Sequence, residues 1–168
     1  MKRKPIIGIM GPGDPNSDKA LKTAFELGRH IAKNDWILLT GGRFAGVMNE
    51  ASKGAASENG IIIGILPGSD LSQMSPHVTI PIRTGMGHAR NAINVLSSDI
   101  VIVCGFGAGT VSEASLSLKM NKPTGFICMS DSDFSLFRRL SDKAEFFNNN
   151  TKEIMEWTIK MVRLKKII

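Results

Sequence analysis

The sequence of 168 residues contains only two cysteines and three histidines, the residue types that form disulfides and zinc sites. Its two cysteines, Cys104 and Cys128, each end an apolar run, so we expect two reduced, buried thiols. No Cys/His spacing is typical of a zinc site, and we expect no catalytic metal. No apolar run approaches the roughly 18–20 residues that cross a membrane. The basic N-terminus lacks a signal-peptide core and cleavage site, so we expect a cytoplasmic protein with no membrane partner.

Three common signatures of nucleotide-binding proteins and hydrolases are also absent. The first glycine turn reads Gly11-Pro12-Gly13 and lacks the third glycine of the dinucleotide fingerprint G-x-G-x-x-G, which disfavours ordinary NAD binding. Neither the Walker pattern G-x-x-x-x-G-K-[ST] nor the Gly-x-Ser-x-Gly nucleophile elbow occurs. These absences argue against a P-loop ATPase and against an α/β-hydrolase.

Aromatic residues are scarce, at 6%, and they do not interleave with the basic residues as a nucleic-acid stacking platform requires. The formal net charge is +6, and part of the excess lies near the two ends, in Lys2-Arg3-Lys4 and Arg163-Leu164-Lys165-Lys166. A basic protein binds either nucleic acid or a small anion. Because solvated, charged ends explain the excess, we expect a small anionic ligand, and nucleic acid is the less favoured partner.

Strand-like and helix-like segments alternate along the chain. Strands are expected at residues 5–10, 36–40, 61–66, 99–104 and 123–129, with a short extended segment at 78–82 and an edge strand at 144–147. Helices are expected at 17–33, 47–59, 86–97, 110–121 and 151–164, with one or two short helical turns at 131–141. Apolar strands separated by helices predict an α/β fold of Rossmann-like type. It is a doubly wound, mostly parallel sheet with helices on both faces, in a single domain spanning residues 1–168.

Glycine-rich turns follow three of the expected strands. The carboxyl ends of parallel strands share one edge of the sheet, where ligands bind at the topological switch point. Bare backbone N–H groups and a helix N-terminus attract an anion there. We therefore predict one composite site for a phosphorylated ligand. Its backbone contacts come from Gly11, Gly13, Gly41, Gly42, Gly107, Ala108, Gly109 and Thr110.

A few side chains near these turns are candidates for chemistry. Glu113 follows Thr110 by three residues, so it is either the second half of a Thr-x-x-Glu capping box or a carboxylate at the mouth of the anion site. Arg90 lies near the start of its helix and either grips a phosphate or is solvated. Arg43, in the second glycine loop, adds a charge to the site or points to solvent. Met86, at the start of the Arg90 helix, is a further candidate ligand contact.

Three ordered motifs resemble those of the LOG-like proteins, long misannotated as lysine decarboxylases. Residues 107–113, Gly-Ala-Gly-Thr-Val-Ser-Glu, resemble the second half of the family's P-G-G-x-G-T-x-x-E motif. Residues 41–48, Gly-Gly-Arg-Phe-Ala-Gly-Val-Met, resemble the G-G-x-x-G-[LV]-M loop with one more residue between the glycines, and His88-Ala89-Arg90 resembles the M-H-x-R segment. The chain departs from the pattern at Gly105-Phe106, where the family has Pro-Gly, and at Asn91, where it usually has Lys.

This resemblance implies two alternative functions. In the family's enzymes the Arg and the Glu act in cleaving the N-glycosidic bond of nucleoside 5′-monophosphates, so Arg90 and Glu113 are the implied catalytic residues if the protein is an enzyme. Residues 64–68 and 84–91, however, are similar to a branch that includes molybdenum cofactor carrier proteins. That cofactor is a pterin with a terminal phosphate, and the Phe106 ring would suit a flat pterin or purine. A molybdenum cofactor carrier or storage protein is therefore the first expectation, and a phosphoribohydrolase is the alternative. The family also implies a homodimer or homotetramer.

Overall fold

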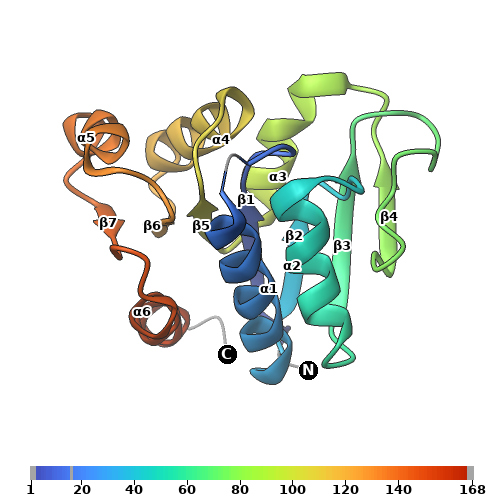
Figure 1. Cartoon of the computed structure of the whole chain (residues 1–168), viewed down its shortest axis with the longest axis horizontal. Helices are drawn as coiled ribbons and strands as arrows, with labels where there is room; N and C mark the ends of the chain where they lie inside the picture. The colour runs from blue at the N-terminus through green and yellow to red at the C-terminus, as the bar shows by residue number, and fades with distance from the viewer. Residues whose placement is uncertain (1–2, 16, 166–168) are drawn as a thin grey trace.

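Seven parallel strands form one sheet within residues 3–15 and 17–165, the part of the chain described by the computed structural model (Figure 1). Residues 1–2, 16 and 166–168 lie outside it, and with them parts of the two basic ends. The strand order is β4-β3-β2-β1-β5-β6-β7. The strands are β1 (Ile6–Met10), β2 (Ile37–Thr40), β3 (Ile61–Leu66), β4 (Ile80–Arg83), β5 (Ile100–Cys104), β6 (Thr124–Ile127) and β7 (Ala144–Phe146). The chain builds outward from β1 to β4, then crosses over to β5, so the switch point lies between β1 and β5.

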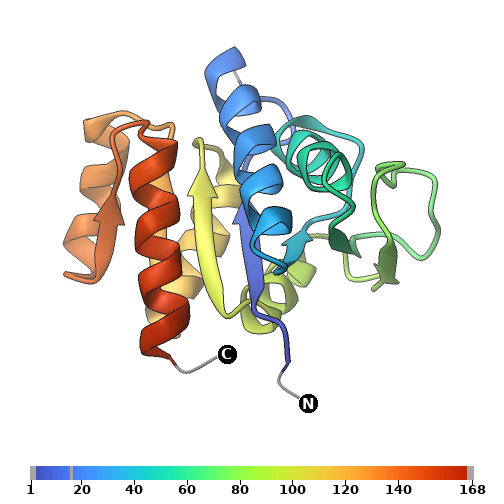
Figure 2. The same ribbon diagram turned by 90° about the horizontal axis from the view of Figure 1, so that it is seen from below.

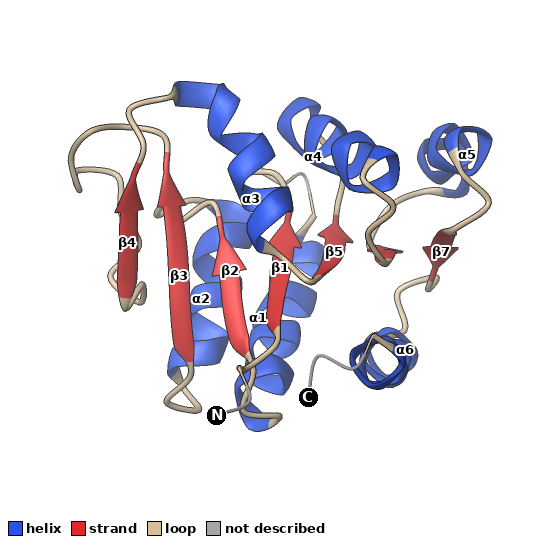
Figure 3. Cartoon of the chain, turned by 180° about the vertical axis from the view of Figure 1, so that it is seen from behind, coloured by secondary structure: helices blue, strands red, loops and turns tan. Residues whose placement is uncertain are grey.

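Helices cover both faces of the sheet (Figures 2 and 3). They are α1 (Asp18–Lys33), α2 (Gly46–Ala56), α3 (Asn91–Ser97), α4 (Ala108–Lys119), α5 (Asp131–Leu140) and α6 (Thr151–Leu164), with a 3₁₀ turn η1 (Gly87–Arg90) before α3. Helices α1, α2 and α6 pack on one face, around Ile9, Leu38 and Ile102. Helices α4 and α5 pack on the other, around Val103 and Phe126, and Ile93 of α3 joins that cluster. The predicted fold class, a doubly wound Rossmann-like α/β sheet, is confirmed.

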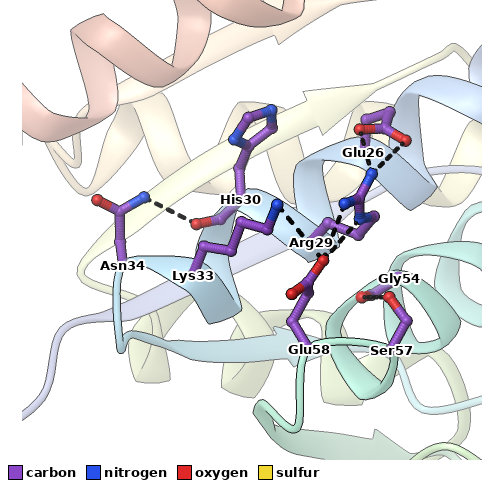
Figure 4. A network of polar contacts seen from close by, with 8 residues as sticks. All are labelled: Glu26, Arg29, His30, Lys33, Asn34, Gly54, Ser57 and Glu58. Atoms are coloured by element: carbon purple, nitrogen blue, oxygen red, sulfur yellow. Dashed lines mark hydrogen bonds and ion pairs between the residues drawn. The ribbon is translucent and has the colours of Figure 1, made fainter.

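Helices α1 and α2 cross with their backbones in close approach. A Cβ added at Gly28 would lie 2.1 Å from the Ala51 carbonyl oxygen, so only glycine allows this approach. At the surface, Glu58 joins the two helices because its carboxylate accepts from Arg29 at 2.9 Å and pairs with Lys33 at 3.5 Å (Figure 4). The contact joins the C-terminal end of α1 to the turn after α2, at the end of these helices that lies away from the carboxyl edge of the sheet.

Some elements differ from the sequence expectation for local physical reasons. The helix expected at 86–97 begins as the 3₁₀ turn η1 and is α-helical only from Asn91. Gly87 has a φ of +54°, which an α-helix cannot contain, so the α-helix does not start at residue 86. The region 131–141, expected as one or two short turns, is a ten-residue helix, and the Ser130 hydroxyl caps it by accepting from the Asp133 N–H. Cys128 is half-buried, not buried as expected. Among the described residues, no helix is long and apolar enough to span a membrane.

Candidate anion-binding site at the sheet switch point

A cavity of about 240 Å³ lies at the switch point, at the carboxyl ends of β1, β2 and β5. These ends and the start of α4 lie at one end of the sheet (Figure 3). Ten of the residues proposed from the sequence line this cavity: Gly11, Gly13, Gly41, Arg43, Arg90, Gly107, Ala108, Gly109, Thr110 and Glu113. The turns after three strands therefore do converge, as the parallel topology required.

Two of the proposed residues lie outside the lining of this cavity. Gly42 (φ +73°) packs against β3, where a Cβ would lie 2.9 Å from the Gly64 Cα, and its carbonyl accepts from the Ser75 N–H. Gly42 therefore shapes the turn without lining the cavity. Met86 is half exposed, in the turn before η1.

The first turn of α4 presents hydrogen-bond donors to the cavity. Gly107, at the N-cap, is extended and provides no side-chain cap for the backbone N–H groups that follow. A Cβ added at Gly109 would meet nothing within 4 Å, so the helix end is open on that side. The buried Thr110 Oγ1 has no hydrogen-bond partner in the protein. This combination suits the oxygens of a phosphate group, because amides, a hydroxyl and the positive helix end act together.

The capping box between Thr110 and Glu113 is not formed, and the Glu113 side chain lines the cavity. Its Oε1 accepts from Asn94 Nδ2 on α3 at 2.6 Å, whereas Thr110 makes no reciprocal contact. Glu113 is 7% exposed. Burial raises the pKa of its carboxyl, and the Asn94 hydrogen bond and the nearby Arg90 charge partly oppose that rise.

Arg90 is a buried cation, not a solvated helix residue. It is 8% exposed, and its Nη1 donates to the Ile65 carbonyl at 2.6 Å. Burial lowers the pKa of this guanidinium, Glu113 raises it, and the positive charge of Arg43 lowers it further. Arg43 also lines the cavity, and its buried Nε has no partner. Two guanidiniums with unused donors thus face the same space, which is the arrangement expected for an anion.

Gly41 has a role that the sequence pattern did not reveal. A Cβ at this position would lie 2.2 Å from Arg90 Nη1 and 2.7 Å from Nη2. The missing side chain therefore makes room for the guanidinium. Phe106 lines a neighbouring cavity, and the expected contact of its ring with the ligand stays a prediction.

Several further residues belong to the site but were not predicted from the sequence. Pro12 and Met48 line the cavity, as does Asn91, whose Nδ2 approaches the Gly109 carbonyl at 3.5 Å. Asn94 orients Glu113 but stands in no motif, so no signal in a single sequence identifies it. Within the described residues, no group of three or more His, Cys, Asp or Glu side chains is arranged to hold a metal ion.

A parallel sheet whose switch point carries a helix N-terminus and two arginines defines a Rossmann-like protein with an anion-binding site. The chain belongs to the SLOG cluster4 family, whose model matches residues 4–157. An uncharacterized protein from Archaeoglobus fulgidus is 41% identical over 117 residues, which are 69% of this chain and 75% of that protein.

Two solved structures are similar over nearly their whole length. The molybdenum cofactor binding protein from Rippkaea orientalis is 45% identical with a TM-score of 0.92, and the molybdenum cofactor carrier protein from Chlamydomonas reinhardtii is 40% identical with a TM-score of 0.89. Each match covers 96% of this chain and 99% of the other. The predicted resemblance to the branch of carrier proteins is thereby confirmed.

Proposed function

We propose that this protein binds the molybdenum cofactor at the switch-point cavity and carries or stores it. The observation that carries the proposal is the similarity to two molybdenum cofactor binding and carrier proteins, at 40–45% identity over 96% of the chain. The cavity supports it independently, because its unused donors suit the terminal phosphate of that cofactor.

The residues of the cavity divide into two groups for such a ligand. The first-turn amides of α4 and the Thr110 hydroxyl bind the phosphate, and the charges of Arg43 and Arg90 balance it. Glu113 lies one helical turn further on, so it faces the part of the ligand next to the phosphate. The carboxyl, held by Asn94, contributes a directional hydrogen bond there.

Phosphoribohydrolase activity is the alternative that the same pair of residues would serve. Arg90 and Glu113 both line the cavity, as that reaction requires, but the similar solved structures named above are a molybdenum cofactor binding protein and a molybdenum cofactor carrier protein, and they do not favour it. A carrier needs a bound ligand and no broken bond. The two functions therefore differ in one measurable product, the free base.

The test uses molybdenum cofactor released from a molybdoenzyme under anaerobic conditions. Equilibrium binding and survival of the cofactor during exposure to air are measured for the wild-type protein, Arg90→Met and Arg83→Met. We expect Arg90→Met to lose protection. Arg83→Met serves as the matched control, because it removes the same charge from the exposed edge strand β4. Failure of the wild-type protein to bind or protect the cofactor would contradict the proposal.

A parallel incubation with AMP decides the alternative. Chromatography that detects free adenine, reduced in Glu113→Gln, would identify a phosphoribohydrolase. We expect no base release. The cytoplasmic location, the homodimer or homotetramer, the exclusion of nucleic acid and a single domain over residues 1–168 stay predictions.

A further inference from the structure

The ends of β5 and β6 bring the two cysteines of the chain together. Cys104 is the register partner of Ile127, so Cys128 lies one residue beyond the position opposite Cys104. Strands about 4.8 Å apart with a rise of about 3.3 Å per residue place the two Cα atoms about 6 Å apart. That separation lies within the roughly 4.4–6.8 Å that a disulfide spans.

The backbone at Cys128 turns its side chain toward Cys104. Strict alternation along β6 would send Cys128 to the face opposite Ile127, yet it packs against the same apolar cluster as Ile127 and Cys104. Its φ is +59°, a left-handed conformation that non-glycine residues adopt rarely. Such residues persist only where the surrounding structure imposes them, and they gather at functional sites.

The two thiols have unequal surroundings. Cys104 is fully buried, and its Sγ donates weakly to the Ala20 carbonyl at 3.6 Å. Cys128 is half-buried and lines a second cavity of about 430 Å³ beside Gly105 and Phe106. A half-buried attacking thiol that opens onto a cavity and is backed by a buried second thiol is the arrangement of a two-cysteine exchange site.

The charged groups around Cys128 come from two elements and a loop. Lys19 of α1, Asp133 of α5 and Asp14 line the same cavity. The contact with the Cys104 thiol lowers the pKa of Cys128 to about 7, burial opposes this, and Thr23 and Lys19 assist it. The same contact, together with burial, raises the pKa of Cys104. At neutral pH, Cys128 is therefore the nucleophile of the pair.

We propose that Cys128 and Cys104 form a thiol–disulfide exchange site for low-molecular-weight disulfides of the type RSSR. The Cys128 thiolate attacks one sulfur of RSSR, which forms a Cys128–SR bond and releases RS⁻. Cys104 then attacks Cys128 Sγ, which forms the Cys104–Cys128 disulfide and breaks the Cys128–SR bond, and the Cys104 proton leaves with the departing thiolate as RSH. Two protein thiols are oxidised, RSSR is reduced to two RSH after protonation, and no other reactant is needed.

The position of the bond connects it to the anion site. Cys104 is followed directly by Gly105 (φ +89°) and the turn that leads into α4. A bridge from Cys104 to Cys128 would tie the base of that turn to the end of β6. The exchange site stands on the strand register and the thiol environment alone, so it does not depend on the identity of the ligand.

The experiment follows the reduced protein by intact mass during incubation with oxidised glutathione. We expect the wild-type protein to lose two hydrogen atoms and retain no adduct, Cys104→Ser to retain one glutathione, and Cys128→Ser to react at least tenfold more slowly. In Cys104→Ser, the rate at which the glutathione adduct forms should rise with pH as the Cys128 thiol loses its proton. A retained adduct on the wild-type protein, or equal rates for the two variants, would overturn the proposal.

A second measurement keeps the test independent of the folding of the variants. Non-reducing peptide mapping of the oxidised wild-type protein should recover residues 104 and 128 in one disulfide-linked peptide pair. Recovery of both cysteines as free thiols, or of a disulfide between two protein molecules only, would refute the intramolecular bridge.

Discussion

The glycine turns after β5 and after β2 look alike in sequence but serve different purposes. After β5, Gly109 faces open space, and the chain enters α4 with bare N–H groups. After β2, the space beside Gly41 is filled by the Arg90 guanidinium, and the space beside Gly42 by the backbone of β3. One turn therefore presents backbone donors to a ligand, whereas the other makes room for a buried cation. A glycine at a ligand edge need not touch the ligand.

Gly41→Ala should have the largest effect, because the new Cβ would displace the Arg90 guanidinium. We expect a loss of about 1–3 kcal/mol in the free energy of unfolding, typical of overpacking, together with at least tenfold weaker cofactor binding. Urea denaturation and equilibrium titration measure the two quantities.

Gly109→Ala is the matched substitution in the other turn. Its Cβ meets no protein atom within 4 Å, so the variant should be as stable as the wild type or more stable by about 0.5–1 kcal/mol. Its affinity for the cofactor should nevertheless fall, because the methyl group stands at the helix end. Equal loss of stability in both variants would contradict the distinction between the two turns.

Thr110→Val tests the hydroxyl in the first turn of α4. The buried Oγ1 has no hydrogen-bond partner in the protein, so replacing the hydroxyl by a methyl group should leave the free energy of unfolding unchanged or raise it by up to about 1–3 kcal/mol. Binding of the cofactor should weaken by about 1.5–3 kcal/mol, the contribution of one hydrogen bond to a charged acceptor. Isothermal titration calorimetry measures the difference. An unchanged affinity would place the phosphate elsewhere.

The smallest expected effect concerns the pH dependence of stability, where two carboxylates should behave oppositely. The pKa of Glu113 is raised by burial, so its stabilising contribution is present below its unfolded pKa and is lost as pH rises through the folded pKa. The pKa of Glu58 is lowered by its hydrogen bond with Arg29, so its contribution is lost as pH falls through the folded pKa (Figure 4).

Glu113→Gln should therefore flatten the fall in stability above about pH 4.5. Glu58→Gln should flatten the loss on the acid side instead. Urea denaturation at a series of pH values measures both slopes, and a change of the same sign in both variants would contradict the assigned environments.

Most strands and helices could be predicted from the local pattern of apolar residues. Periodic apolar runs identified nearly every strand and helix, because burial of one face imposes a period of 2 or 3.6 on the residues themselves. The later start of α3 was missed, since positive φ at Gly87 is permitted by glycine but not required by it. The helix α5 was underestimated, because its stability depends on Phe134 and Phe137 packing on β6.

The sequence by itself determined the alternation of strands and helices, the glycine turns and the presence of Arg90 and Glu113 near a ligand edge. Each of these depends on residue type and spacing within a short stretch of chain. Only the tertiary structure decided that Gly41 accommodates Arg90, that Asn94 holds Glu113, and that Cys128 faces Cys104. These contacts join residues from different elements, so they follow from how the elements pack and not from any local pattern.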